Sequence, residues 1–102
     1  MLTKPFDLSQ ATALIISFYY RHNGLQAGRV RLQLFNGTSY DDIGELGDSE
    51  EDTWHYYTVT IHKAGDQARY FRPDSRIRLE ASLDPGEKFC LDDVTIRIPW
   101  RR

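Results

Sequence analysis

The chain has 102 residues, which suits one domain that can bury a core of its own. Its net charge of −2 excludes a general affinity for nucleic acid or for anionic membrane surfaces. A single cysteine, Cys90, excludes an internal disulfide framework, and we expect it to be a structural thiol rather than a nucleophile. No stretch approaches the roughly 20 apolar residues of a membrane helix, so we expect no membrane insertion.

The first third of the chain contains two predicted strands after a short N-terminal segment. Residues 4–9 are expected to form a short edge strand with a turn, because Pro5 cannot donate to a central ladder. Residues 13–21 are apolar at both parities, which predicts a central strand covered on both faces. Residues 29–35 alternate between apolar and polar side chains, as a half-buried strand does.

Asn36-Gly37 is the strongest turn signal in the chain, because this dipeptide favours a two-residue hairpin loop. Asn36-Gly37-Thr38 is also a glycosylation sequon. The sequence favours the turn and leaves a glycan-bearing asparagine as the alternative.

The second half of the chain contains further alternating segments and no predicted helix. Residues 41–52 hold seven acids and no base, and we expect a short strand near Tyr40 followed by a solvated acidic loop. Residues 54–62 and residues 76–83 each alternate, which predicts one strand in each.

The last predicted strand, residues 89–98, changes register in its middle. Phe89 and Leu91 share one parity, and the later apolar residues share the other. One extra residue at Asp92-Asp93, a β-bulge, would bring both groups back to the same core. The sequence therefore predicts two carboxylates at a kink in a buried final strand.

Several short strands separated by turns predict an all-β fold, a jelly-roll-like sandwich of two antiparallel sheets. We expect one module over residues 1–102, with residues 99–102 as a tail or linker. Trp54 is expected in the core rather than on a ligand platform. The residues predicted to be buried together are Leu14, Ile16, Phe18, Leu32, Leu34, Val59, Ile61, Ile77, Leu79, Leu91, Val94 and Ile96.

Three segments together resemble extracellular jelly-roll modules. They are Pro5-Phe6-Asp7-Leu8-Ser9 followed by Leu14-Ile15-Ile16-Ser17-Phe18-Tyr19-Tyr20, Trp54 leading Val59-Thr60-Ile61, and Phe89-Cys90-Leu91-Asp92-Asp93-Val94. Such modules include MAM-type adhesion domains, bacterial cleaved-adhesin domains and galactose-binding-like carbohydrate-binding domains. The resemblance implies a secreted or cell-surface location.

The chain also departs from the modules that it resembles. It lacks the disulfide pairs of animal MAM domains, and Tyr40 stands where these modules often carry tryptophan. In those modules a further strand precedes the Pro5-Phe6-Asp7 segment. We therefore expect an outer strand to be missing, which would leave a sheet edge open to self-association.

Asp92 and Asp93 are the candidate metal ligands. Calcium prefers several carboxylate and carbonyl oxygens, and a bulge exposes carbonyl groups. The resemblance adds that galactose-binding-like modules often hold a structural Ca²⁺ near a terminal strand. The alternative is that these side chains accept hydrogen bonds from the free amides of the bulge.

A polar face rich in arginine is the candidate ligand site, provided that the strands concerned share a sheet. Guanidinium forks and flat rings suit sugars and acidic groups. The alternative is an ordinary solvated face held by Arg–Glu pairs, with Tyr40, Tyr70 and Phe71 as the next ligand candidates. The expected ligand-binding residues are Arg29, Arg31, Gln33, Tyr56, His62, Arg76 and Arg78.

These observations predict a non-catalytic carbohydrate-binding module of a larger secreted or cell-surface protein. The alternative is a protein–protein adhesion or assembly module with the same sandwich. An enzyme is not expected, because the three histidines have no metal-ligand spacing and no convergent acid and base stand out.

Overall fold

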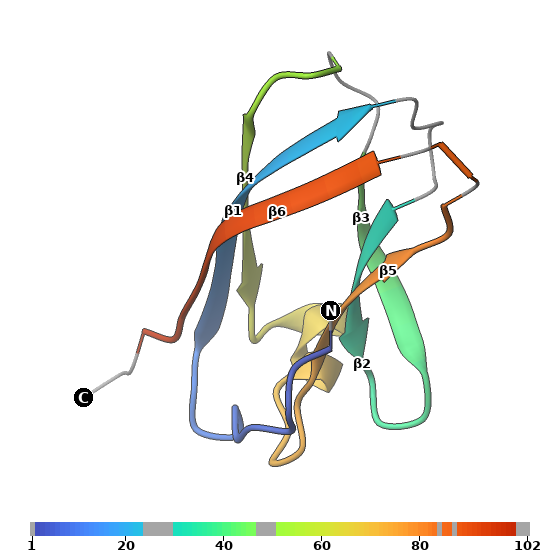
Figure 1. The fold of residues 1–102 in the computed structure, drawn as a ribbon. Helices are drawn as coiled ribbons and strands as arrows, with labels where there is room; N and C mark the ends of the chain where they lie inside the picture. Colours follow the sequence, from blue (N-terminus) through green and yellow to red (C-terminus); the bar gives the residue numbers. More distant parts are fainter. Residues whose placement is uncertain (1, 24–29, 47–50, 84, 87, 100–102) are drawn as a thin grey trace.

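Two three-stranded antiparallel sheets pack face to face and form the predicted all-β, jelly-roll-like sandwich (Figure 1). The computed structural model describes residues 2–23, 30–46, 51–83, 85–86 and 88–99. One sheet has the order β4–β1–β6 and the other the order β3–β2–β5. The strands are β1 (Ala13–Asn23), β2 (Val30–Phe35), β3 (Tyr40–Leu46), β4 (His55–His62), β5 (Ile77–Ala81) and β6 (Lys88–Arg97).

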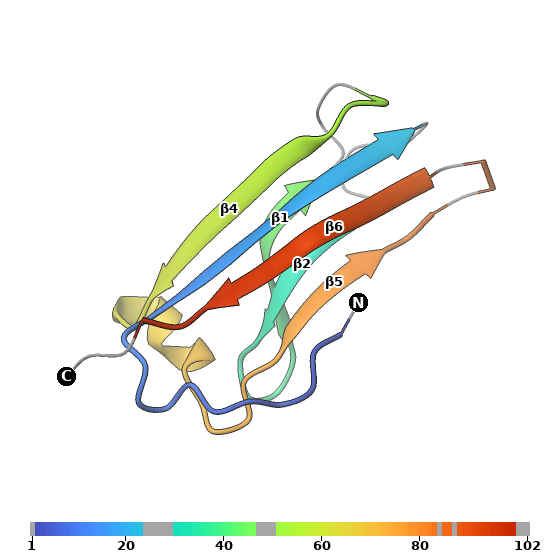
Figure 2. The same cartoon turned by 60° about the vertical axis from the view of Figure 1, so that its left-hand side comes forward.

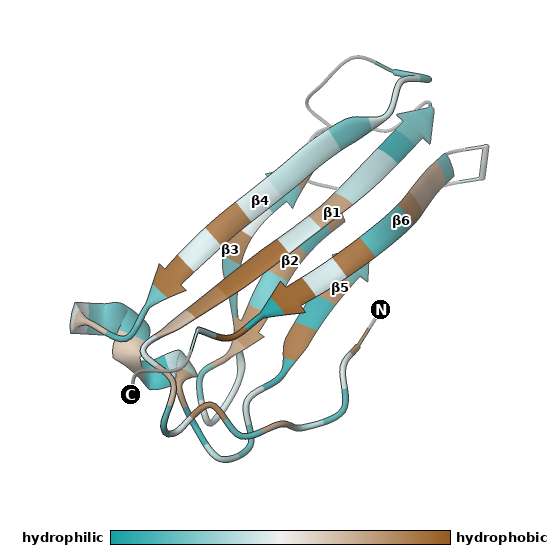
Figure 3. Ribbon diagram, turned by 90° about the vertical axis from the view of Figure 1, so that its left-hand side faces the viewer, coloured by the Kyte–Doolittle hydropathy of each residue, from teal (hydrophilic) through white to brown (hydrophobic). Residues whose placement is uncertain are grey.

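Strand β1 is the centre of its sheet, as its apolar sequence predicts. Its inward row, from Leu14 to His22, is buried at every second residue. The outward row is not covered, since Tyr19 is 42% exposed. The expectation that both faces of this strand are covered is therefore wrong. In Figure 3 the first half of β1 is a continuous apolar run and its end is hydrophilic, so the alternation along this strand is one of burial rather than of hydropathy.

Most of the predicted core residues meet between the two sheets. Half-buried members at the margin are Val59, Leu91 and Ile96, which pack against the cluster. Val94 is 38% exposed, so its assignment to the core is wrong. The predicted residues that are buried are Leu14, Ile16, Phe18, Leu32, Leu34, Ile61, Ile77 and Leu79.

The predicted β-bulge in β6 is present, but it lies one residue further along than Asp92-Asp93, at Asp93-Val94. Ser17 of β1 pairs with Thr95, whereas Tyr19 pairs with Asp92, so two residues of β6 oppose one residue of β1. Asp93 takes the left-handed conformation there, with φ of 52°. However, β6 is an edge strand with half-buried and exposed side chains, not the buried strand that was expected.

The N-terminal segment runs along the outer side of β5, as an edge strand should. Leu2 bridges to Arg78 and Phe6 to Ser75. The amide of Phe6 donates to the Ser75 carbonyl at 2.9 Å, and the reverse bond has the same length. Asp7 then accepts hydrogen bonds from the Ser9 amide and hydroxyl, which closes the predicted turn.

The turn at Asn36-Gly37 joins β2 to β3, so the predicted hairpin forms, although its loop has four residues rather than two because Phe35 pairs with Tyr40. Gly37 has a φ of 106°, which only glycine adopts without strain. The Asn36 side-chain oxygen accepts from the amides of Thr38 and Ser39. Its amide nitrogen donates to Asp41 at 2.9 Å. The Asn36 side chain therefore stabilises the turn through these hydrogen bonds.

A short 3-10 helix, η1 (Gly65–Tyr70), corrects the expectation that the chain has no helix. Six residues are too few for a helical period to be read from the sequence. The hydroxyl of Tyr70 donates to Asp41 on β3 at 2.8 Å, which ties η1 to the opposite sheet. No helix in the described ranges is long and apolar enough to cross a membrane.

Two partly buried tyrosines that pack against the core, Tyr57 and Tyr70, predict a loss of stability at alkaline pH. Burial, reinforced by the nearby Tyr20 hydroxyl, raises the pKa of Tyr57 above 10.0. Burial and the hydrogen bond to Asp41 raise the pKa of Tyr70 in the same direction. The folded state holds both protons more tightly, so this contribution is complete below pH 10.0 and is lost as the pH rises through the raised pKa values.

We therefore expect the melting temperature to fall once the pH rises above about 10. The Tyr57→Phe variant removes one titrating group, so its melting temperature should fall less steeply over the same pH range. Melting curves followed by circular dichroism measure both. Parallel pH profiles for the two proteins would contradict the assignment to Tyr57.

Candidate ligand-binding face

Three exposed aromatic side chains form a row on the outer face of sheet β4–β1–β6. Trp54, Tyr56 and Tyr19 are 47%, 58% and 42% exposed. Tyr19 pairs with Tyr56 across β1 and β4, and their ring centroids are 5.0 Å apart. Trp54 stands two residues before Tyr56 and so shares its side of the strand. We call Tyr19, Trp54 and Tyr56 the aromatic face.

The position of Trp54 corrects the expectation that it lies in the core. Along β4 the inward residues are Tyr57, Val59 and Ile61, so the even-numbered residues point outward. Trp54 comes directly before β4 and keeps this outward parity. Exposed aromatic rings on a solvent-facing sheet surface do not contribute to the core between the sheets. The aromatic face is therefore a candidate binding surface.

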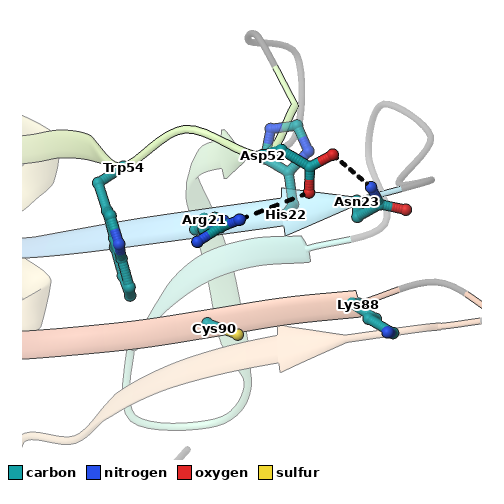
Figure 4. A pocket seen from close by; sticks show the side chains of 7 residues that line it. All are labelled: Arg21, His22, Asn23, Asp52, Trp54, Lys88 and Cys90. Carbon is teal, nitrogen blue, oxygen red and sulfur yellow. Dashed lines mark hydrogen bonds and ion pairs between the residues drawn. The ribbon is translucent and has the colours of Figure 1, made fainter.

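A pocket of about 310 Å³ opens beside Trp54 (Figure 4). This volume lies at the lower end of the range for small-molecule sites. Strands β1 and β6 supply most of the lining, and the segment before β4 supplies the rest. The lining residues are Arg21, His22, Asn23, Asp52, Trp54, Lys88 and Cys90.

Asp52 is held over the end of β1 by three contacts. Its amide donates to the His22 carbonyl at 2.9 Å. One carboxylate oxygen accepts from the Asn23 side chain at 2.7 Å, and the other lies 3.9 Å from Arg21. The pocket therefore presents a carboxylate, a carboxamide and a guanidinium side by side (Figure 4).

Strand β6 supplies the opposite wall of the pocket. Cys90 pairs with Arg21, and Lys88 pairs with Asn23, so both side chains point to the outer face. Cys90 is exposed, so the expectation of a structural thiol within an apolar strand is wrong. With Arg21 and Lys88 against Asp52, the charged groups of the lining sum to one positive charge.

The predicted ligand-binding residues do not share one sheet. Arg31, Gln33 and Arg78 lie on the outer face of β3–β2–β5. Tyr56 and His62 belong to β4 in the other sheet, and only Tyr56 joins the aromatic face. Arg76 precedes β5 at one end of its sheet. Arg29 lies outside the described residues.

The arginines of the β3–β2–β5 face are engaged by neighbouring side chains. Arg31 lies 3.1 Å from Glu80 and 3.4 Å from Asp42. Arg78 donates to Gln33 at 2.7 Å and to Glu80 at 3.2 Å. This arrangement is the solvated face with Arg–Glu pairs that the sequence left as an alternative.

Asp93 lies in the bulge and Asp92 directly before it, close to where the sequence places them. The Asp92 carboxylate accepts from the Asp93 amide at 2.9 Å, which is the capping role named as the alternative to metal binding. Among the described residues, no group of three or more His, Cys, Asp or Glu side chains is arranged to hold a metal.

The calcium hypothesis predicts a higher melting temperature in Ca²⁺ than in EDTA, because a ligand that binds only the folded state stabilises it by mass action. At a hundredfold excess over the dissociation constant this gain is about 2.7 kcal/mol. Asp93→Asn should remove the gain. Coincident melting curves in calcium and EDTA would exclude calcium binding, and capping of the bulge would remain as the role of these carboxylates.

Sequence reasoning identified Tyr56 but missed most of the site. Trp54 could have been found, since it continues the outward parity of Tyr56 across two residues. Tyr19, Arg21 and Cys90 could not, because their position depends on which strands flank β1.

No family model, curated protein or solved structure matches the chain. The resemblance to extracellular jelly-roll modules stays a prediction from the sequence. A sandwich fold hosts many functions, so the functional argument depends on the chemistry of the site.

Proposed function

We propose that the protein is a non-catalytic carbohydrate-binding module of a larger secreted or cell-surface protein. The observation that carries the proposal is the aromatic face, a row of exposed rings that ends at a polar pocket. Aromatic rings give a large, rigid apolar surface, and the apolar face of a sugar ring can lie on it.

The pocket supplies the hydrogen-bonding groups that such recognition needs. Sugar hydroxyls both donate and accept hydrogen bonds, so they need a mixed set of partners. Arg21 and Lys88 donate, Asp52 accepts, and the Asn23 carboxamide does both. The sequence predicted recognition by guanidinium groups and rings, and the proposal places that chemistry on the aromatic face.

Binding rather than hydrolysis fits the lining of the pocket. Glycosidases generally use two carboxyl groups on either side of the scissile bond. The described lining offers one, Asp52.

A glycan array tests the proposal, with Cys90 as a site-specific handle. The wild-type protein should bind a defined set of glycans, and alkylation by a bulky maleimide should abolish binding because the thiol lines the pocket. A Cys90→Ser variant should bind before and after the same treatment. The proposal fails if the wild-type protein binds no glycan, or if the alkylated protein binds as well as before.

A second candidate function, assembly with another copy of the chain, is favoured by the edge of β6. Strand β6 lies at the edge of its sheet. Among the described residues, no strand pairs with the edge of β6 that faces away from β1. Its inward apolar residues are only half-buried, and Val94 is 38% exposed. Figure 2 shows β6 beside β1 at the edge of its sheet. Exposed edges of this kind recruit another strand.

The charges of β6 restrict how two copies could pair. Full antiparallel overlap would oppose Lys88 to Arg97, and like charges directly opposite are destabilising. Pairing centred on Ile96 would instead set Val94 opposite Ile98 and Arg97 opposite Thr95, so that no like charges are directly opposite. The favoured assembly is therefore a short ladder around Ile96.

Light scattering over a wide range of protein concentrations tests this second candidate. We expect the average mass to rise with concentration and an Ile96→Lys variant to remain monomeric. Thr60→Lys, on the outer face of β4, adds the same charge away from β6 and should assemble as the wild type does. A wild-type protein that stays monomeric throughout would exclude assembly through β6.

A further inference from the structure

Two arginine side chains gather around the ring of Phe35, at the end of sheet β3–β2–β5 where the Asn36-Gly37 turn leaves β2. The guanidinium carbon of Arg76 lies 4.7 Å from the ring centroid, and that of Arg72 lies 6.0 Å from it. The Phe35 amide donates to the Arg76 carbonyl at 3.1 Å, which fixes Arg76 beside the ring.

Arg76 differs from the paired arginines of the same face. Within the described ranges, no carboxylate lies within ion-pair distance of its guanidinium. Its Nε is buried without a hydrogen-bond partner. A partly buried cation is costly unless it is paired, and contact with the ring offsets only part of this cost.

Arg72 adds a second cation that is only partly neutralised. Its Nε donates to Asp74 at 2.8 Å, and its Nη1 and Cζ lie against Gly37. Two guanidinium groups and one carboxylate leave a net positive charge around Phe35. The Tyr40 ring lies 5.4 Å from that of Phe35, and Arg78 stacks on the Tyr40 ring with its guanidinium carbon 4.0 Å from the ring centroid.

We propose that Arg72 and Arg76, gathered around Phe35, form a binding site for an oxyanion, the sulfate, phosphate or carboxylate group of a ligand. Guanidinium groups bind such anions through paired N–H donors, and stacking on a ring orients the fork. With Nε of Arg76 buried, its Nη groups are the donors that face the anion. This site lies on the sheet opposite the aromatic face, so it does not depend on the proposed glycan binding.

A titration with anions at constant ionic strength tests the site, observed through the backbone amide signals of Phe35, Gly37 and Arg76. Sodium sulfate, sodium phosphate and sodium glucuronate should each be compared with sodium chloride. We expect saturable shifts at these amides for at least one oxyanion and none for chloride. Tighter binding of sulfate or phosphate assigns a tetrahedral group to the ligand, and tighter binding of glucuronate assigns a carboxylate.

Variants distinguish a specific anion-binding site from a general attraction of anions to positive charge. Arg76→Gln should weaken binding roughly tenfold or more, because charged hydrogen bonds are lost. Arg76→Lys keeps the charge but loses the fork and should also bind more weakly than the wild type. Arg97→Gln removes one exposed charge on β6 and should bind as the wild type does.

Arg72→Gln serves as a second test in case Arg76→Gln does not fold, which its amide spectrum would reveal. Equal affinity in the wild type and in the variants of both arginines would overturn the proposal. So would shifts that do not saturate, or that chloride produces equally, because they would reflect screening alone.

Discussion

Leu32→Ala should lower the free energy of unfolding by about 2–5 kcal/mol, one of the largest effects of a single substitution in this chain. Leu32 has no exposed surface and lies in β2, the central strand of its sheet. It pairs with Leu79 on β5 and with Gly44 on β3, so truncation leaves a cavity beside the Leu79 side chain that Gly44 has no side chain to fill. Urea denaturation measures the change.

Val94→Ala is the matched control for this core prediction. Val94 is also an aliphatic residue in a strand, but it is 38% exposed at the bulge of β6. We expect a loss below about 1 kcal/mol, since little apolar area returns to water. A loss at Val94 equal to that at Leu32 would contradict the described boundary of the core.

Trp54→Ala should weaken glycan binding roughly thirtyfold, about 2 kcal/mol, with little change in stability. Trp54 borders both the aromatic face and the pocket, so its removal affects stacking and pocket shape together. Because the side chain is half-exposed, unfolding should change by only about 0.5 kcal/mol. Isothermal titration with a glycan that the array identifies gives the affinity.

Arg31→Ala is the control on the opposite face. The sequence predicted Arg31 as a ligand-binding residue, whereas the structure pairs it with Glu80 and Asp42. We expect the affinity of this variant to equal that of the wild type. A large loss with Arg31→Ala and none with Trp54→Ala would return the site to the arginine-rich face.

The sandwich could be predicted from the sequence because alternation marks the inward row of each strand. Leu32 and Leu34 illustrate this, since both are buried where the period of two places them. A bulge near Asp92-Asp93 was also predictable, because the parity of the apolar residues changes there, although the bulge itself lies at Asp93-Val94. Val94 was wrongly placed because it is itself a bulge residue: Asp93 and Val94 together oppose Phe18, so Val94 does not keep the regular inward position.

The candidate site was harder to predict, because parity tells which residues point outward but not which sheet they occupy. Tyr56 and Arg31 both point outward, yet they lie on opposite sides of the sandwich. The pocket joins Arg21, Asp52 and Cys90, which only strand pairing brings together. Long-range pairing of this kind leaves no signal in the local pattern of one sequence.

The central claim is that the aromatic face and its pocket bind the ligand, and a single amide-shift titration tests it most directly. On addition of a glycan from the array, the largest shifts should appear at Trp54, Tyr56, Tyr19 and Cys90, and at the indole N–H of Trp54. Shifts confined to Arg31, Gln33 and Arg78, with the Trp54 indole unchanged, would contradict it.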